Sequence, residues 1–361
     1  MSKPRTYLDW NATTPLRPEA RAAMIAAMDV VGNPSSVHGE GRAAKGLIER
    51  ARGQVAAAVG CKPSEVVFTS GATEAAMILA RQPDECRVIV DDTVHDAVWS
   101  HFDLPVGELG ERGSSHTLAM GLANNETGII SQPPTREDGL FVYRNVQAKR
   151  LLLDLTQAIG RIAFAFSWSD ADFAILSAHK LGGPKGVGAL IVREGLDIAP
   201  LATGGGQEMG RRAGTENLIG IAGFGAAAEA AAADLAAGVW DAVAQRRDQL
   251  EQRIANDAPE TICVGKDAAR LPNTSCLLSP GWKGETQVMQ MDLAGYAISA
   301  GSACSSGKVR ASRVLRAMGY DEADAACAIR VSIGPETTDA QLGGFADAWI
   351  AAHQRHRARA A

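Results

Sequence analysis

The sequence has no cysteine pair with CxxC spacing and no Cys/His pattern with the spacing of a metal site. Its six cysteines are scattered along 361 residues: Cys61, Cys86, Cys263, Cys276, Cys304 and Cys327. This distribution argues against structural zinc and against a disulfide framework. We therefore expect reduced thiols, as in a cytoplasmic protein.

Positive charge and long apolar runs are also lacking. The formal net charge is −5, which argues against a nucleic acid or an anionic membrane as the partner. No apolar run approaches the roughly 20 residues that cross a bilayer. The first five residues lead directly into an apparent strand, so we expect no signal peptide. These absences predict a cytoplasmic protein without nucleic-acid or membrane partners.

What remains is a composition typical of a soluble globular protein, with 46% hydrophobic and 21% charged residues. The chain is longer than one hydrophobic core usually supports, so two domains are expected. Up to about Ala236, strands are predicted at 65–69, 86–90, 150–153, 173–176 and 187–192, and helices at 18–28, 37–59 and 75–80. This alternation favours an α/β domain with a largely parallel sheet and helices on both faces.

The alanine-rich segment 226–237 and the segment 240–254 after it predict a long helical connection between two domains, because alanine is the best helix former. After them, short strands at 261–264 and 274–278 are separated by helices, as in an α+β domain. We therefore expect a large domain over 13–236 and a small domain formed by 1–12 and 237–361.

Lys180 lies in the segment from Ser177 to Gly186. Directly after an apolar run, four residues of this segment carry a hydroxyl (Ser177), an imidazole (His179) and an amine (Lys180). A lysine is rarely placed directly after a buried strand unless its amine has a role there, because burying an ammonium group is costly. One interpretation is a cofactor bound to Lys180 as a Schiff base, with Ser177 and His179 beside it. The other is a surface loop with a solvated lysine, and this segment alone does not decide between them.

Two further turns follow predicted strands. The segment 70–74 leads into a helix, where free backbone N–H groups and the helix dipole can bind an anion such as phosphate, although many α/β turns look like this. Asp154 ends another strand, with Gln157 three residues later. The carboxyl ends of parallel strands are where open α/β sheets bind ligands, so Asp154 is a candidate site residue.

The expected small domain contains two residues with chemical potential. Cys304 lies in a segment of almost entirely small residues, 299–308, and such a loop could carry a thiol to a substrate. The alternative is a tight turn with an inert cysteine, since most free cysteines behave as small hydrophobes. Arg330 lies inside an apolar strand, where an arginine usually has a dedicated carboxylate partner from the protein or from a ligand.

A series of motifs spread over nearly the whole chain resembles the NifS/IscS family of cysteine desulfurases, class V enzymes of the pyridoxal phosphate (PLP)-dependent fold-type I group. The motifs are Asn-Ala-Thr-Thr-Pro at Asn11, Gly-Asn-Pro-Ser-Ser at Gly32, Thr-Ser-Gly-Ala-Thr-Glu at Thr69, Asn-Asn-Glu-Thr-Gly at Asn124, Ser-Ala-His-Lys at Ser177, Arg-Ala-Gly-Thr at Arg212, Gly-Ser-Ala-Cys at Gly301 and Ile-Arg-Val-Ser at Ile329. Each is modest alone, but their order and spacing are specific. The resemblance implies a large domain with a mainly parallel seven-stranded sheet and a smaller α+β domain that carries the cysteine loop.

The resemblance also implies a cofactor site. Lys180 would bind PLP, and Asp154 would pair with the pyridinium nitrogen, which makes the ring an electron sink. His95 is similar to an imidazole that stacks on the ring, and Gln157 and Asn125 to residues that bond the phenolic oxygen and the substrate. The implied phosphate ligands are Ala72, Thr73, Ser177 and His179, together with Thr215 from the second subunit of a homodimer.

The implied reaction converts L-cysteine to L-alanine. The implied substrate residues are Asn11, Asn125 and Arg330, of which Arg330 binds the carboxylate; the implied catalytic residues are Lys180, His95 and Cys304. Cys304 would take the substrate sulfur as a persulfide and pass it to an acceptor, commonly an Fe–S scaffold or a sulfur-carrier protein. No resident metal is expected, and Cys304 is the residue that could ligate an Fe–S cluster transiently during transfer.

Three alternatives differ from this interpretation. A class V selenocysteine lyase or aminotransferase is the nearest, but transamination requires no mobile thiol such as Cys304. A PLP-binding protein that only docks partners would need none of the predicted catalytic residues. A flavodoxin-like or Rossmann binding module is the third, and no GxGxxG motif follows the first strand to support it.

Overall fold

The computed structural model describes residues 5–83, 85–105, 116–144, 146–300 and 311–360. The chain divides into two units. The small unit comprises Met1–Thr13, Ala123–Ile130 and Gly238–Ala361, and the large unit comprises Thr14–Leu122 and Ser131–Ala237. The segment Ala123–Ile130, which we expected within the large domain, therefore belongs to the small unit.

The large unit is built on a seven-stranded sheet. Its strands, in spatial order, are β2 (Val66–Thr69), β11 (Gly188–Val192), β10 (Phe173–Ser177), β9 (Arg150–Asp154), β5 (Thr117–Gly121), β3 (Val88–Val90) and β4 (Leu104–Pro105). The five strands from β10 to β4 are parallel, and β11 runs antiparallel to both of its neighbours. The predicted mainly parallel, seven-stranded sheet is confirmed.

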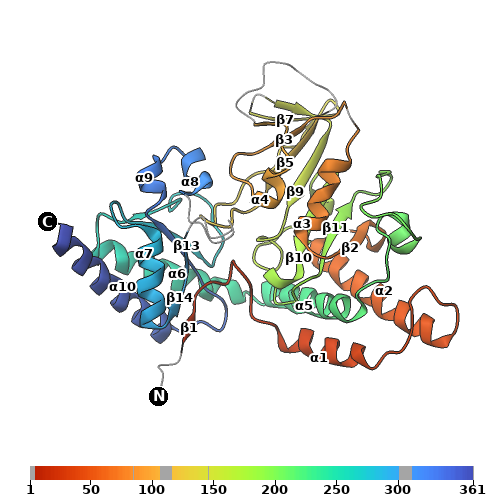
Figure 1. The fold of residues 1–361 in the computed structure, drawn as a ribbon, viewed down its shortest axis with the longest axis horizontal. Helices are drawn as coiled ribbons and strands as arrows, with labels where there is room; N and C mark the ends of the chain where they lie inside the picture. The colour runs from red at the N-terminus through yellow and green to blue at the C-terminus, as the bar shows by residue number, and fades with distance from the viewer. Residues whose placement is uncertain (1–4, 84, 106–115, 145, 301–310, 361) are drawn as a thin grey trace. The chain divides into compact units, whose positions relative to one another are not determined.

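One long helix of the large unit, α5 (Leu218–Ala236), packs against two others, α1 (Pro18–Met28) and α2 (Gly39–Val59) (Figure 1). Pro18 at the first turn suits the start of α1, because this position needs no backbone N–H donor. The predicted helix over 37–59 begins two residues later, since the side chain of His38 accepts a hydrogen bond from Gly41 N and caps α2. Gly60 ends α2 in the left-handed conformation, as the sequence predicted.

Among the described helices, α5 is long and apolar enough to cross a membrane by length and composition alone. This corrects the expectation that no segment comes close to that length. However, 44% of its apolar window is buried inside the protein, where α5 packs against α1 and α2. A helix that is apolar on most sides is typical of a protein core, and Glu229 and Asp234 interrupt its apolar run.

Short elements connect the strands of the large unit. They are η1 (Pro63–Glu65), α3 (Ala72–Ala75), η2 (Ala76–Arg81), α4 (Asp96–Trp99), η4 (Phe166–Trp168), η5 (Ala178–Lys180), η6 (Gln207–Gly210) and a separate sheet of β6 (Arg136–Glu137), β7 (Leu140–Tyr143) and β8 (Val146–Ala148). The helix predicted at 75–80 is thus one α-helical turn that continues as a 3-10 helix. Its buried residues, Ile78 and Leu79, belong to the core beneath β3 and β10.

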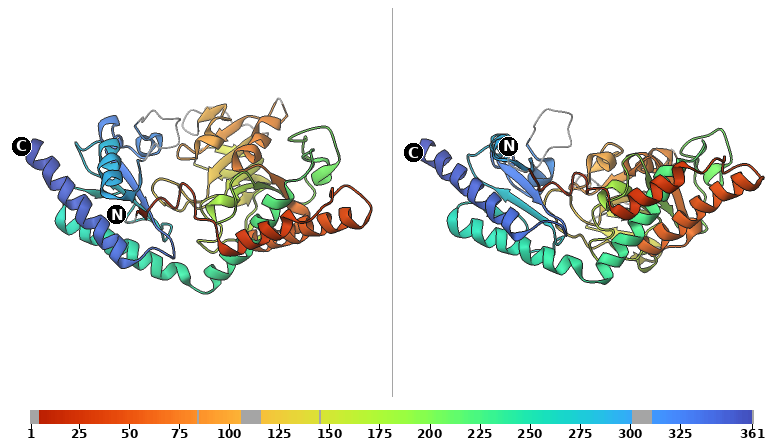
Figure 2. Two further views of the ribbon diagram at one scale, coloured as in Figure 1. Left: turned by 60° about the horizontal axis from the view of Figure 1, so that its bottom comes forward. Right: turned by 90° about the horizontal axis from the view of Figure 1, so that it is seen from below.

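The small unit has a four-stranded antiparallel sheet in the order β12 (Ile262–Cys263), β13 (Thr274–Leu278), β16 (Ala328–Ser332) and β15 (Ser299–Ala300). The helices α6 (Val239–Asp257) and α7 (Gly284–Ala294) pack against its strands, and α10 (Asp339–Ala360) packs against both of these helices (Figure 2). Two short helices, α8 (Arg313–Ala317) and α9 (Glu322–Ala325), precede β16. The predicted α+β character of this part is confirmed.

Two distant segments complete the small unit. The strand β1 (Thr6–Tyr7) pairs in parallel with β14 (Tyr296–Ala297). In the segment Ala123–Ile130, the carbonyl of Gly128 accepts a hydrogen bond from Leu271 N (2.7 Å), and Ile130 N donates to Ala269 O (2.9 Å). Backbone hydrogen bonds therefore tie both segments to the C-terminal part of the chain.

Candidate functional site

Lys180 lies directly after β10, on the 3-10 turn η5. Its carbonyl oxygen accepts hydrogen bonds from Thr14 Oγ1 (2.8 Å) and from Arg161 Nη2 (3.0 Å). The guanidinium of Arg17 binds the next carbonyl, that of Leu181, at 3.0 Å. The backbone around Lys180 is therefore anchored at the end of a buried strand, whereas Lys185, beyond the Gly-Gly-Pro turn, is exposed.

His179 is half-buried beside this lysine. Burial, together with the positive charges of Lys180 and Lys185, lowers the pKa of His179 to about 4. The imidazole is therefore neutral at physiological pH. A neutral ring can donate one hydrogen bond and accept another.

Asp154 ends β9, the strand between β5 and β10. The register of the parallel strands pairs Asp154 with Ile175, so its carboxylate lies at the same sheet edge as Ser177 and the turn after it. Asp154 Oδ1 accepts a hydrogen bond from Thr156 N (2.9 Å). The structure thus brings Asp154 and the Lys180 turn to one edge of the sheet, where open α/β sheets bind ligands.

Gln157 is buried near the same edge, and its Oε1 accepts a hydrogen bond from Arg161 Nη1 (2.5 Å). Because Arg161 also binds the Lys180 carbonyl, one guanidinium joins the helical turn after β9 to the turn after β10. The hydroxyl oxygen of Thr156 is buried and has no hydrogen-bond partner among the described residues. A buried polar atom without a partner at this edge is consistent with a ligand that the protein would bind here.

The turn from β2 into α3 carries Ala72 and Thr73 at the start of the helix. The carboxylate of Glu74 stabilises this turn. Its Oε2 accepts a hydrogen bond from Ser70 N (2.6 Å), and its Oε1 accepts one from Arg212 Nε (2.9 Å). Although burial opposes ionisation, these hydrogen bonds and the charge of Arg212 lower the pKa of Glu74. The helix α3 packs against β10 and β11, so the predicted phosphate turn and Ser177 belong to neighbouring elements.

His95 follows β3, again at a carboxyl strand end, and caps the short helix α4. Its Nδ1 accepts a hydrogen bond from Ala97 N (3.1 Å). In the neutral ring, the proton is therefore on Nε2, which leaves that nitrogen as the donor. The stacking role of His95 stays a prediction.

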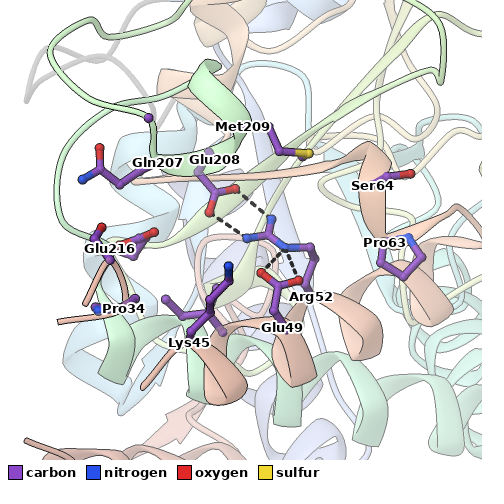
Figure 3. Close-up of a pocket in the computed structure, with 13 residues that line it drawn as sticks. Pro34, Lys45, Glu49, Arg52, Pro63, Ser64, Gln207, Glu208, Met209 and Glu216 are labelled. Carbon is purple, nitrogen blue, oxygen red and sulfur yellow. Dashed lines mark hydrogen bonds and ion pairs between the residues drawn. The ribbon is translucent and has the colours of Figure 1, made fainter. Parts of the chain in front are cut away.

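The loop that carries Thr215 borders a cavity of about 830 Å³ (Figure 3). Figure 3 shows Arg52 of α2 between Glu49 and Glu208. Two guanidinium nitrogens of Arg52 each donate a hydrogen bond of 2.8 Å to one of the Glu208 carboxylate oxygens. Glu208 and Met209 have left-handed backbones (φ 49° and 58°), a strained conformation that this buried ion pair helps to hold. None of the predicted site residues that the structure describes lines this cavity, and Thr215 itself is exposed.

The small unit holds the residues predicted to bind substrate. Arg330 is buried on the strand β16, and its Nη2 lies 2.7 Å from Asp9 Oδ1. Its Nη1 donates to the carbonyl of Asn125 (3.1 Å). Asn11 is buried and donates to the same Asn125 carbonyl (3.1 Å) and to Thr274 Oγ1 (2.9 Å). The structure therefore brings Asn11, Asn125 and Arg330 together, and Asp9 is the carboxylate partner expected for an arginine in an apolar strand.

Cys304 lies outside the described residues. Four residues near these groups were not predicted from the sequence: Asp9, Thr14, Thr156 and Arg161. Asp9 could have been found from the sequence, because it is the acidic residue within an otherwise apolar segment before the Asn11 turn. The others resemble ordinary solvated residues in sequence.

Comparisons with known proteins agree with this description. The family model described as aminotransferase class-V matches residues 6–97 and 113–345. A cysteine desulfurase from Cereibacter sphaeroides is 38% identical, with 94% of this chain and 93% of the relative covered. A cysteine desulfurase from Frankia sp. (strain EuIK1) is 39% identical over 94% of this chain and 89% of the relative. The solved structure of a NifS-like protein from Rickettsia africae aligns with a TM-score of 0.84 and 28% identity, covering 97% of this chain and 99% of that one.

Proposed function

Because the chain belongs to the aminotransferase class-V family and is an enzyme of the cysteine desulfurase type, we propose that its described residues form the PLP and substrate sites of that reaction. The reaction converts L-cysteine to L-alanine and transfers the sulfur as a persulfide on Cys304. The observation that carries the proposal is the register of β9 and β10, with Asp154 and the Lys180 turn at one sheet edge.

The residues at this edge fit PLP. Lys180 would hold the cofactor covalently through Nζ, and Asp154 would pair with the ring nitrogen. A buried hydroxyl without a partner, Thr156 Oγ1, supports a ligand at this edge. The phosphate would meet donors that suit an anion, namely the backbone N–H groups of Ala72 and Thr73, the hydroxyls of Thr73 and Ser177, and a neutral His179. When bound, PLP supplies an electron sink for the electrons left on the substrate Cα.

The protein's own residues then bind the substrate and handle its protons. Arg330 would bind the substrate carboxylate, and Asn11 and Asn125 would border it. Lys180 Nζ can take and return a proton at the substrate Cα. In the neutral ring of His95 the proton is on Nε2, because Nδ1 accepts a hydrogen bond from Ala97 N, so Nε2 is the nitrogen that can donate.

Cys304 carries the sulfur step. Its thiolate attacks the substrate sulfur, the new S–S bond forms as the Cβ–S bond breaks, and the electron pair stays with the substrate carbon, which is then protonated. We propose an Fe–S scaffold or a sulfur-carrier protein as the acceptor, with Cys304 as a transient cluster ligand during delivery. The exposed Thr215 supports a homodimer in which it reaches the phosphate of the second subunit. The free state of the five described cysteines supports the cytoplasm as the compartment.

The test measures alanine released from L-cysteine in the presence of a reducing thiol as acceptor. We expect the wild type to release alanine, and Cys304→Ser to keep the cofactor absorbance and release little. Cys86→Ser is the matched control and should behave like the wild type, since the Cys86 thiol lies against Arg87 O and Thr117 Oγ1, which are not part of the proposed site. Full activity of Cys304→Ser would contradict the persulfide step. Faster turnover of selenocysteine than of cysteine, independent of Cys304, would instead identify a selenocysteine lyase.

A further inference from the structure

The guanidinium of Arg330 is only partly satisfied. Its Nη2 donates to Asp9 Oδ1 (2.7 Å) and its Nη1 to the carbonyl of Asn125 (3.1 Å). Its Nε is buried and has no hydrogen-bond partner among the described residues. The residue is 3% exposed, so water does not readily supply that bond. An unpartnered N–H in such a place lowers stability unless a ligand completes it.

Asp9 is held rigidly beside this guanidinium. The residues on either side of it pair with two strands of the small unit: Leu8 N donates to Ala297 O (2.9 Å), and Trp10 N donates to Ser332 O (3.1 Å). The second oxygen of Asp9 accepts a hydrogen bond from Ser299 Oγ (2.8 Å). Both carboxylate oxygens are therefore fixed, one by a serine and the other by the arginine.

Strand register explains why Ser299 can reach this pair. Ser299 on β15 lies directly opposite Arg330 on β16, and directly opposed residues in antiparallel strands point to the same face of the sheet. Asp9 forms an isolated bridge with Ser332, two residues farther along β16. The N-terminal segment thus places the Asp9 carboxylate at the face of the sheet on which the side chains of Arg330 and Ser299 lie.

We propose that Asp9 is a positioning residue for substrate recognition. By occupying Nη2, it fixes the rotation of the Arg330 side chain so that the Nε–H donor is presented to the α-carboxylate of the amino-acid substrate, and Ser299 fixes Asp9 in turn. This inference rests on the proposed function, in which Arg330 binds that carboxylate.

A purely structural ion pair is the competing explanation, and the same unit contains one for comparison. Glu251 binds Arg270 through both oxygens (2.7 and 2.8 Å) and also accepts a hydrogen bond from Ser275 Oγ (2.7 Å). It therefore shares the carboxylate, arginine and serine of the Asp9 cluster. Among the described residues, however, no nitrogen of Arg270 is left both buried and unpartnered, whereas Nε of Arg330 is.

The experiment separates carboxylate recognition from folding. For each variant, kcat and KM for L-cysteine are measured. The Kd values of L-alanine and of L-alaninamide, which lacks the carboxylate, are then measured from the shift that they cause in the cofactor absorbance. Asp9→Ala should raise KM about tenfold to a hundredfold, as expected for a lost charge-assisted hydrogen bond, with kcat within about threefold of wild type. Its preference for L-alanine over L-alaninamide should fall by a similar factor, while the Kd of L-alaninamide stays unchanged.

Three variants complete the design. Asp9→Asn keeps the Oδ1 acceptor and the volume, so it should fold and should lose only part of the preference. In an Arg330→Ala background, Asp9→Ala should cause no further loss, because the two residues act as a unit. Glu251→Gln should lower the unfolding midpoint and leave KM and the preference unchanged.

An unchanged preference in folded Asp9 variants, or full additivity with Arg330→Ala, would overturn the inference. Absence of alanine formation by the wild type would instead overturn the proposed function.

Discussion

Replacing Glu208 by alanine removes a carboxylate that joins the Thr215 loop to the body of the large unit. Its Oε2 accepts hydrogen bonds from Arg52 Nη1 and from Phe68 N, and its Oε1 accepts from Arg52 Nη2, all at 2.8 Å. The side chains of Glu208 and Arg52 are 1% and 7% exposed. Burial alone would lower the pKa of Arg52, but the hydrogen bonds and charge of Glu208 outweigh it and raise the pKa. The guanidinium is therefore charged, and Glu208 is its buried carboxylate partner.

The expected loss follows from this geometry. Breaking a buried ion pair by removing one partner costs about 3–5 kcal/mol, because a buried charge is left uncompensated. Glu208→Ala should lower the free energy of unfolding by about 3 kcal/mol, the low end of this range, because the half-exposed Glu49 still lies 3.3 Å from Arg52 Nε. The double change Arg52→Met with Glu208→Leu removes both charges and should cost less, about 1–3 kcal/mol, which is the penalty of leaving Phe68 N without its acceptor.

Equilibrium unfolding in urea, followed by far-ultraviolet circular dichroism, measures these differences. The matched control is Glu194→Gln, which breaks an ion pair with Lys62 in which both side chains are more than half exposed, and should cost less than about 0.5 kcal/mol. A loss below about 1 kcal/mol for Glu208→Ala would refute the reasoning. So would a double variant that loses as much stability as Glu208→Ala or more.

Two further predictions concern the sheet edge at which we propose that the cofactor binds. The pKa of His179 is lowered to about 4, so the folded protein keeps this ring neutral down to that pH, whereas the unfolded chain takes up a proton below about pH 6.5. The free energy of unfolding should therefore fall as the pH drops from 6.5 to 4. For a half-buried group we expect a loss of about 1–2 kcal/mol. His179→Gln should flatten this part of a plot of urea midpoint against pH, and an unchanged plot would contradict the assignment. A Cβ on Gly188 would lie 2.5 Å from Leu176 O and 2.6 Å from Gly71 Cα, so Gly188→Ala should displace the phosphate turn and raise the Kd of PLP at least about tenfold. Gly186→Ala is the control, because a Cβ at Gly186 would meet no atom within 4 Å, although its backbone is left-handed (φ 78°). This variant should be less stable than the wild type but should change the Kd of PLP less than Gly188→Ala does. Equal Kd values for the two variants would argue against the steric explanation.

Residue patterns that depend on local rules were predictable from the sequence. The helix α1 matches its expected range because Pro18 suits a first turn, and Gly60 ends α2 because a left-handed C-cap favours glycine. Asp154 and Lys180 were recognised as site candidates because each follows a buried apolar strand. Such signals lie within a few residues of the feature that they predict.

Pairings between distant residues were not predictable in the same way. Arg52 and Glu208 lie 156 residues apart, one on an amphipathic helix and the other in a glycine-rich loop, where both resemble solvated charges. Arg330 was expected to have a carboxylate partner, but that partner, Asp9, lies 321 residues away in the sequence and is brought to Arg330 by its isolated bridge with Ser332. The assignment of Ala123–Ile130 to the small unit likewise depends on hydrogen bonds to Ala269 and Leu271.

The most direct test of the account concerns Lys180, the lysine proposed to hold the cofactor. The purified protein is saturated with PLP and treated with borohydride, which reduces an imine between a lysine and the aldehyde to a stable amine. Peptide mass mapping then locates the added pyridoxyl group. We predict modification of Lys180, loss of the cofactor absorbance in Lys180→Ala, and no change in Lys185→Ala, since Lys185 is exposed. Stoichiometric labelling of Lys185, or failure of the wild type to take up PLP, would contradict the account.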